Sequence, residues 1–308
     1  MYNQKKILVI RNITPLHAGS GSEIGFVDLP IQREKHTNFP KIEASSLKGS
    51  IREALESKLG QDNIKIHLTF GYDEDSDVKE EIKKKLNGDG NDNNTEYAGS
   101  VAFSDARLLL FPVKSAKKVF AWITCPYVLN RFNTELILAG LEPIKLPEEL
   151  KNINNNNDFC IAASKKQLID QKMILEEYAF NADVNQELAQ TMAKLVGVPD
   201  LTERLTVVSD DAFKNFVSTS TEVITRTKID NSTGAVKDGA LFNEEYLPAE
   251  SVLYSIIMAA PVFNKINEGL DSGDKTLQFI VQNLPEYFQI GGNATLGKGI
   301  VKTNLLGA

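Results

Sequence analysis

Glycine-rich segments that also carry basic side chains lie near both ends of this 308-residue chain. Residues 14–21 include His17, Lys48 is followed directly by Gly49, and residues 290–299 contain Lys298 among several glycines. Glycine lets a backbone come close to a ligand, and exposed N–H groups attract anions. These segments therefore predict a local binding track for a polyanion.

The C-terminal segment partly fits a nucleotide-binding pattern. Gly292–Lys298 matches the GxxxxGK start of a P-loop, but Gly299 stands where that loop has the Ser or Thr that binds magnesium. The few residues that follow are too short for the required helix and sheet, which argues against an NTPase. Two readings stay open, a phosphate contact through backbone N–H groups and a glycine turn before an edge strand.

Two side chains in the N-terminal segment could do chemistry. Asp28 lies among apolar residues between Gly25 and Pro30, where a carboxylate either accepts backbone hydrogen bonds or takes part in catalysis. The segment alone favours the structural role. His17 follows Pro15 and could act as an acid or base, stack on a nucleobase, or pack internally. No histidine pair has the spacing of metal ligands.

An amphipathic helix is predicted over residues 45–59, with apolar residues at spacings of four. Ser45 or Ser46 is expected to cap its start, and Gly60 to follow its end. Gly49 is unfavourable inside a helix. Free N–H groups at the helix start, with Lys48 and Arg52, predict a phosphate site. A solvated basic turn is the alternative.

The other segments alternate between strand and helix patterns. Strands are expected over residues 5–13, 100–111, 119–124, 222–229, 240–246 and 251–262, with a last one inside 291–305. Helices are expected over residues 126–141, 184–196, 210–217 and 275–288. This order favours an α+β fold with a ferredoxin-like or RNA-recognition-motif sheet.

The domain organisation predicted is one elaborated domain, residues 1–308. Residues 61–100 are acidic and then rich in Gly and Asn, which is typical of a surface insertion, and residues 142–200 are expected to form a helical insertion. Residues 223–252 contain two β-rich stretches joined by ten mostly polar residues, which predicts a projecting hairpin.

Composition limits the location and the partners. The net charge of −7 argues against an indiscriminate nucleic-acid binder, but residues 1–60 carry nine basic against six acidic residues. No apolar run predicts a membrane span, and the N-terminus lacks a signal-peptide pattern. Cys125 and Cys160 are expected to be buried thiols. A cytoplasmic protein without a membrane partner is predicted.

Three motifs stand in order along the chain. They are Thr14–Gly21 with Val27–Glu34, His36–Thr37, Phe39–Pro40 and Ser45–Gly49, then Ile229–Ala235 with Gly239–Phe242 and Glu244–Glu250, then Ile290–Gly299. Together they resemble the RAMP superfamily, and within it the backbone subunit of the type III-B CRISPR effector, the Cmr complex. The resemblance spans most of the chain, and residues 61–100 and 145–200 are its least informative parts.

The resemblance implies an RNA-recognition-motif palm, a projecting β-hairpin thumb, and copies that stack along a guide (CRISPR) RNA with other Cmr subunits. It implies an endoribonuclease that cleaves complementary single-stranded target RNA at regular intervals with a divalent metal, Mg or Mn. Asp28 would be catalytic and would bind the metal, and Glu244 or Glu245 could be a second acid. Expected RNA contacts are His17, Ser45, Ser46, Lys48, Arg52, Arg226, Gly291, Gly292, Asn293, Thr295 and Lys298.

Two other functions stay open at this point. One is a non-catalytic, guide-RNA-binding scaffold in which Asp28 only braces its loop. The other is a guide-processing endoribonuclease of the same superfamily, for which His17 is the best candidate acid or base. The hairpin carries less basic character than is usual in this family, since Asn231 follows Asp230. Which hairpin residues contact RNA therefore stays open.

Overall fold

The computed structural model describes residues 2–22, 26–72, 84, 97–263 and 266–307. Most of the surface insertion expected over residues 61–100 lies outside these. The described beginning of that segment belongs to the core, because helix α2 (Ile64–Phe70) buries every side chain from Ile66 onward. Apolar residues at the start of this segment, which its acidic average composition conceals, bury this helix in the core.

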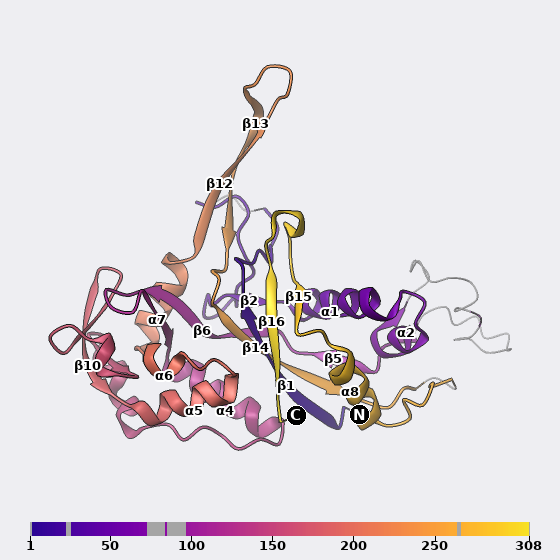
Figure 1. The fold of residues 1–308 in the computed structure, drawn as a ribbon, viewed down its shortest axis with the longest axis horizontal. Helices are drawn as coiled ribbons and strands as arrows, with labels where there is room; N and C mark the ends of the chain where they lie inside the picture. The colour runs from indigo at the N-terminus through magenta and orange to yellow at the C-terminus, as the bar shows by residue number, and fades with distance from the viewer. Residues whose placement is uncertain (1, 23–25, 73–83, 85–96, 264–265, 308) are drawn as a thin grey trace.

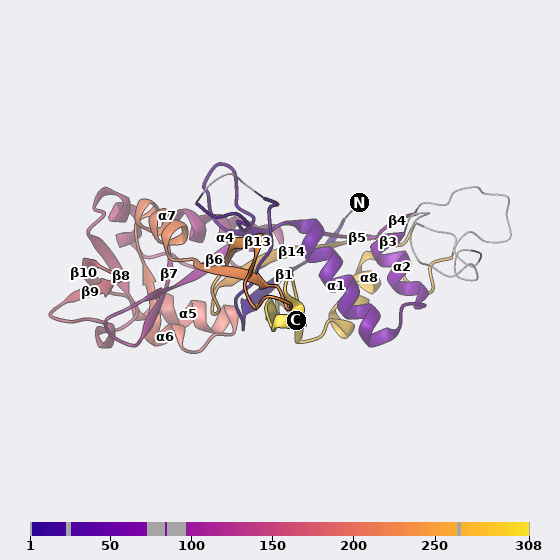
Figure 2. The same cartoon turned by 90° about the horizontal axis from the view of Figure 1, so that it is seen from above.

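A mixed sheet of twelve strands runs the length of the molecule (Figures 1 and 2). Its antiparallel half, which we call the palm, contains in spatial order β15 (Tyr287–Gln289), β16 (Ile300–Leu306), β1 (Gln4–Asn12), β14 (Val252–Ala259) and β6 (Ala106–Lys114). Ile7 of β1 lies opposite Leu306 on one side and Ile256 on the other, and all three are buried. The short strands β2 (Lys41–Ile42) and β5 (Val101–Phe103) pair with β6 and β14.

The sheet continues into a second half, which we call the side lobe (residues 120–220). Its strands, again in spatial order, are β7 (Phe120–Thr124), β11 (Leu205–Val207), β8 (Phe159–Ala162), β10 (Tyr178–Val184) and β9 (Lys172–Leu175). Its helices are α4 (Pro126–Leu138), α5 (Gln186–Val196), α6 (Leu201–Arg204) and α7 (Asp210–Thr219), with 3₁₀ turns η1 (Glu148–Asn155) and η2 (Lys165–Gln167).

The insertion at residues 142–200 is therefore mixed, and its prediction as helical was wrong. It contributes β8, β9 and β10 to the sheet, in addition to α5. These strands are four to seven residues long. Periodicity in so short an apolar run does not distinguish a strand from a helix segment.

Helices α1 (Ala44–Leu59) and α8 (Gly273–Asn283) pack against palm strands. The prediction of α1 is confirmed, as is Gly60 at its end, but the serine cap is wrong. The helix begins at Ala44, whose N–H donates to Oδ1 of Asp105 at 2.9 Å. A side chain from a distant turn thus does what Ser45 or Ser46 was expected to do. Helix α8 ends before Pro285, so residues 287–289 form β15 instead of extending the predicted helix.

Strands β12 (Glu222–Ile229) and β13 (Val236–Tyr246) form a hairpin that rises out of the body between the palm and the side lobe (Figure 1). The two strands are in register from Glu222 opposite Tyr246 to Thr227 opposite Leu241, and the register shifts before Ile229. Strand β13 begins four residues earlier than predicted, because the ladder extends past Ala240 toward the tip. The projecting hairpin is confirmed.

Three shorter elements complete the described chain, namely β3 (Gly71–Tyr72), β4 (Tyr97–Ala98) and η3 (Ala294–Leu296). Cys125 and Cys160 are both fully buried, as predicted, and burial raises the pKa of both thiols, that of Cys160 to about 12. Among the described residues, no helix combines the length and the apolar character that crossing a bilayer requires.

Candidate nucleic-acid interface and active site

Residues 26–34, here called the strap, pair with the base of the hairpin. The N–H of Leu29 donates to the carbonyl oxygen of Asn243 at 3.0 Å, and the N–H of Glu245 donates to the carbonyl oxygen of Leu29 at 3.0 Å. Leu29 thereby forms a parallel bridge with Glu244. Because the strap pairs with β13 at Asn243–Glu245, near the base of the hairpin, it brings Asp28 to the point where the hairpin leaves the body.

Asp28 is exposed, and one of its oxygens has a fixed partner. Oδ2 accepts a hydrogen bond from the N–H of Asn243 at 2.7 Å, so the side chain braces the strap against β13. Within the part of the chain that the structure describes, no hydrogen bond engages Oδ1. The neighbouring Phe26 is fully exposed. Asp28 thus combines a structural contact with a carboxylate oxygen that remains open to a ligand.

A polar cluster lies beside Asp28, on the face of β13 that carries Glu244 and Tyr246. Glu244 is only 4% exposed and accepts hydrogen bonds from Arg226 Nη1 at 2.7 Å, Asn293 Nδ2 at 2.6 Å and the hydroxyl of Tyr246 at 2.6 Å. Arg226 Nη1 also donates to Oδ1 of Asn293 at 2.9 Å, and the Lys298 ammonium lies 4.7 Å from the centre of the Tyr246 ring. Two predicted RNA contacts, Arg226 and Asn293, therefore meet at one buried carboxylate, and a third, Lys298, lies on the adjoining Tyr246 ring.

The electrostatics of this cluster make Glu244 an anion at neutral pH. Burial alone would raise its pKa, but hydrogen bonds from Tyr246 and Asn293 and the charges of His17 and Arg226 lower the pKa below the usual value. Burial and the same hydrogen bond raise the pKa of Tyr246 to about 12. A carboxylate held in this way is a poor proton donor. The geometry assigns Glu244 a structural role in positioning Arg226 and Asn293.

His17 joins the two glycine-rich segments. Its Nδ1 lies 2.7 Å from the carbonyl oxygen of Glu245, so this nitrogen donates, and its Nε2 lies 3.6 Å from Oε1 of Glu244. The N–H of Gly292 donates to the carbonyl oxygen of His17 at 2.9 Å. A Cβ at Gly291, which has φ +81°, would lie 2.3 Å from that oxygen. This glycine therefore allows the two segments to pack on each other.

Glu245 faces away from Glu244 and ties the strap to the hairpin entrance. It is 5% exposed and accepts hydrogen bonds from Arg33 Nη2 at 2.5 Å, Thr221 Oγ1 at 2.7 Å and the N–H of Ile31 at 3.0 Å. Arg33 also donates to the carbonyl oxygen of Val217 at the end of α7. These contacts fix the side chain as a clamp between three segments and leave its two oxygens occupied.

The start of α1 forms a separate, open groove of about 620 Å³ that is lined by Ser45, Lys48 and Arg52 together with aromatic side chains. Burial and the Arg52 charge lower the pKa of Lys48. Arg52 is already engaged by Glu56, by the carbonyl oxygen of Gly71 and by His67. Of the two basic residues, Lys48 is the one available to a ligand.

The backbone at Gly49 is open, because among the described residues no atom beyond its chain neighbours and its own helix backbone lies within 4 Å of where its Cβ would be. Glycine at this helix position costs about 1 kcal/mol of stability relative to alanine. Packing within the described chain gives no reason for a glycine here. Ser46 Oγ accepts from Gln32 Nε2 at 3.4 Å, and the same amide donates to the carbonyl oxygen of Gly19. The start of α1 and the strap are thereby joined through Gln32.

Several residues at this site were not predicted from the sequence, namely Arg33, Asn243 and Tyr246. Arg33 and Asn243 act through contacts between distant segments, which local sequence does not reveal. Tyr246 had a usable signal, since Glu244 and Tyr246 are two residues apart and lie on one face of a strand. Thr295 is exposed in the η3 loop, and the structure gives it no contact that tests its predicted role.

The donor set at Asp28 limits how a divalent metal could bind. Among the described residues, no group of three or more His, Cys, Asp or Glu side chains could enclose an ion. Mg²⁺ commonly binds through one or two carboxylates, with waters and substrate phosphates completing the shell. The open oxygen of Asp28 fits an ion shared with RNA, and does not fit a metal held by protein ligands alone.

Comparison with known proteins identifies similar chains. The sequence pattern of the RAMP superfamily matches residues 9–302. The CRISPR system Cmr endoribonuclease Cmr4 of Pyrococcus furiosus is 35% identical over 302 residues, which cover 95% of this chain and 92% of that protein. The CRISPR system CMR subunit Cmr4 of Saccharolobus solfataricus is 27% identical, covering 99% and 97%.

Solved structures share the architecture. The crystal structure of oligomeric Cmr4 from Pyrococcus furiosus superposes with a TM-score of 0.70 at 29% identity, covering 99% of this chain and 100% of that chain. A chain of the type III-B Cmr-beta complex bound to cognate target RNA gives a TM-score of 0.72 at 23% identity, covering 99% and 98%. The predicted α+β fold class, a palm with a projecting hairpin, is confirmed by these similarities.

Proposed function

We propose that this chain, which belongs to the RAMP superfamily, is a backbone subunit of a type III-B CRISPR ribonucleoprotein that binds guide RNA and cleaves complementary target RNA. A relative that is 35% identical over 95% of the chain is named a Cmr endoribonuclease. The observation that carries the proposal is the position of Asp28, exposed at the base of a projecting hairpin and beside a cluster of residues predicted to contact RNA.

The reaction proposed is attack by a target 2′-hydroxyl oxygen on the adjacent phosphorus, with departure of the 5′-oxygen of the next nucleotide. This step needs in-line geometry and stabilisation of charge more than a protein nucleophile. The hairpin supplies the geometry by displacing one nucleotide from the guide–target duplex. Asp28 would hold a divalent ion, Mg²⁺ or Mn²⁺, which when bound supplies charge stabilisation at the phosphate.

The other residues of the site position the RNA and Asp28. Arg226, Lys298 and Lys48 face the RNA backbone, which is the constant part of a guide whose sequence varies. Glu244 aligns Arg226 and Asn293, and Glu245 holds the strap through Arg33. Both glutamates therefore serve as positioning residues in this proposal and not as the second acid.

The rival function is a guide-binding scaffold, and the hydrogen bond from Asn243 to Asp28 is the observation in its favour. Asp28→Asn separates the two functions. The amide oxygen can still accept the Asn243 N–H, so the brace remains while the charge is lost. In a reconstituted complex we expect guide binding and assembly to be unchanged and target cleavage to fall by two orders of magnitude or more, consistent with the effect of a residue that acts in the transition state.

Asp28→Ala and Asp200→Asn are the matched controls. Asp28→Ala removes both brace and charge, whereas Asp200 is an exposed acid in the side lobe. Cleavage at the wild-type rate by Asp28→Asn would favour the scaffold.

If the isolated chain cuts free repeat RNA and His17→Gln abolishes this cutting, the result would favour guide processing. Restoration of cleavage by Mn²⁺ after EDTA treatment tests the metal separately.

A further inference from the structure

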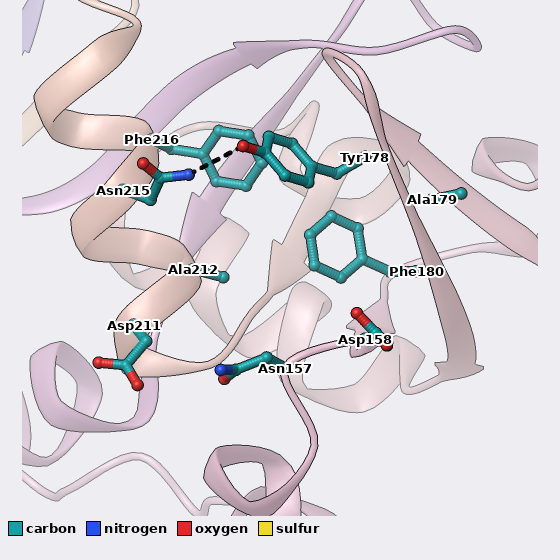
Figure 3. A pocket seen from close by; sticks show the side chains of 9 residues that line it. All are labelled: Asn157, Asp158, Tyr178, Ala179, Phe180, Asp211, Ala212, Asn215 and Phe216. Carbon is teal, nitrogen blue, oxygen red and sulfur yellow. Dashed lines mark hydrogen bonds between the residues drawn. The ribbon is translucent and has the colours of Figure 1, made fainter.

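A pocket in the side lobe lies apart from the site described above (Figure 3). It has a volume of about 260 Å³ and opens to solvent. Its walls come from three segments that are distant in sequence, namely the turn before β8, strand β10 and helix α7. The residues that line it are Asn157, Asp158, Tyr178, Ala179, Phe180, Asp211, Ala212, Asn215 and Phe216.

Three aromatic rings form a fixed apolar wall. The Tyr178 ring meets Phe216 edge-on, with ring centres 5.6 Å apart at 87°, and Phe180 lies 6.2 Å from Phe216. Asn215 Nδ2 donates to the Tyr178 hydroxyl at 3.2 Å, a contact drawn in Figure 3. Phe180 and Phe216 are buried, but Tyr178 is 52% exposed. The Tyr178 ring is therefore held in place while much of its surface remains available.

The charge around this wall is negative. Asp158 lies beside the Phe180 ring, and Asp211 stands at the rim where α7 begins (Figure 3). Neither carboxylate has an ion pair within the described residues, and the described lining contains no lysine, arginine or histidine. The whole side lobe, residues 120–220, carries 14 acidic and 9 basic residues. A nucleic-acid phosphate would be repelled here, whereas a cation would be attracted.

The volume of the pocket further limits which ligand can occupy it. Pockets for drug-sized ligands have volumes of roughly 300–1,000 Å³, so about 260 Å³ suits one side chain better than a nucleotide. A planar guanidinium stacks on an aromatic face and pairs with a carboxylate through two parallel hydrogen bonds, which an ammonium does not do. We propose that this pocket receives an arginine side chain of a protein partner. The inference does not depend on RNA cleavage.

The first test measures binding of a defined probe to the full chain labelled with 3-fluorotyrosine. The Tyr178 signal is assigned with Tyr178→Phe and followed in titrations with N-acetyl-L-arginine amide, with the citrulline analogue, which has the same shape but no charge, and with N-acetyl-L-lysine amide. We expect a saturable shift with arginine, and affinity about tenfold weaker for citrulline and for lysine. Equal affinity for arginine and citrulline, or no saturable shift with arginine, overturns the proposal.

Variants locate the interaction. Asp158→Asn is expected to weaken arginine binding about tenfold, the size of effect that a lost charge-assisted pair produces, and Asp211→Asn to weaken it less. Asp200→Asn, an exposed acid elsewhere in the same lobe, is the control and should bind as the wild type. Because these are surface substitutions, thermal melting should be unchanged. Wild-type binding by Asp158→Asn would contradict the assignment.

The second test uses the assembled ribonucleoprotein. p-Benzoylphenylalanine placed at Tyr178 is activated by light, and the cross-linked products are identified by mass spectrometry. The proposal expects a peptide of a protein subunit whose arginine, when changed to glutamine, abolishes the cross-link. A cross-link to RNA, a cross-link to a peptide that is insensitive to its arginines, or no cross-link in the complete complex each overturns it.

Discussion

At the residue scale, one buried carboxylate organises the polar cluster at which RNA contact is proposed. Glu244 has three hydrogen-bond donors from three different segments, namely Arg226 on β12, Tyr246 on β13 and Asn293 before η3. Removing this buried carboxylate costs more free energy of folding than a single hydrogen bond contributes, because the donors around it are left buried without an acceptor. Substitution of Glu244 should therefore affect folding stability as well as RNA contact.

The prediction for Glu244 concerns its pH dependence. The carboxyl pKa is lower in the folded than in the unfolded chain, so its contribution is fully present above the unfolded pKa and is lost as pH falls through the folded value. Glu244→Gln should lower the free energy of unfolding by about 1–3 kcal/mol at pH 7, with the gap closing below about pH 4.5. Urea titrations at a series of pH values measure it; a gap independent of pH would contradict it.

Lys48 carries the second prediction at this scale. Lys48→Ala should weaken guide binding for all sequences alike and reduce the slope of log affinity against log salt by about 0.7, the value for one phosphate contact on a single strand. Lys58→Ala is the control, since Lys58 lies at the other end of α1 and donates to the carbonyl oxygen of Asn283. A loss of affinity that depends on guide sequence, with an unchanged slope, would show that Lys48 reads bases.

At the scale of elements, the projecting hairpin is the part that packing within this chain does not account for, and a partner outside the chain is needed to explain it. An isolated pair of strands is marginally stable in water, and in this one Val223, Ile229, Val236 and Leu241 are each between 49% and 63% exposed. Its base is held by the strap and by the Glu245 clamp, whereas its outer half has no support from the described body (Figure 1). The outer half is thus free to act on a bound RNA.

Shortening the hairpin tests this role. Replacing Asn231–Lys237 with a two-residue turn should leave thermal stability and guide binding nearly unchanged, because these residues are exposed and contribute little to the core. Target cleavage should lose its regular spacing or its rate, as seen on sequencing gels of labelled target. Substitution of Glu176 and Glu177 by Gln, in the exposed β9–β10 turn, is a control on the side lobe. A full-strength ladder of regular spacing from the shortened hairpin would place the spacing element elsewhere.

At the scale of the whole molecule, one continuous sheet joins the palm, where RNA binding is proposed, to an acidic side lobe. The sheet passes from β6 to β7 without a break, and a single hydrophobic core spans both halves. Residues 120–220 carry an excess of acid, whereas residues 1–60 carry an excess of base. This separation of charge is consistent with the two proposals, that a chain of net charge −7 binds RNA on one part of its surface and protein on another.

The continuity of the core yields a prediction about the two cysteines. Cys125 and Cys160 are buried in it, and burial raises the pKa of both thiols. Native protein should resist iodoacetamide at pH 8, and labelling should appear only as the chain unfolds, with both thiols reacting at the same urea concentration if the two halves unfold together. Mass spectrometry of the labelled protein measures this. Earlier reaction of Cys160 would instead indicate that the side lobe opens independently.

The sequence by itself determined the elements that have strong hydrophobic periodicity or clear start and stop residues. Helix α1 was predicted from the spacing of Leu47, Ile51 and Leu55, and α4 from Pro126 at its first position. The hairpin was predicted from its polar loop between β-rich stretches. The three motifs also led to the family, to Asp28, and to a set of residues expected to contact RNA.

Only the tertiary structure decided how those residues are used. It showed that Glu244 and Glu245, adjacent in sequence, face opposite sides of β13, where one orders Arg226 and the other holds Arg33. It also placed Asp105 at the start of α1 and continued the sheet through short strands in residues 142–200. The reason is physical. Local patterns depend on neighbours within a few residues, whereas a buried carboxylate takes its role from the donors that folding brings to it, and these lie up to 214 residues away in the chain.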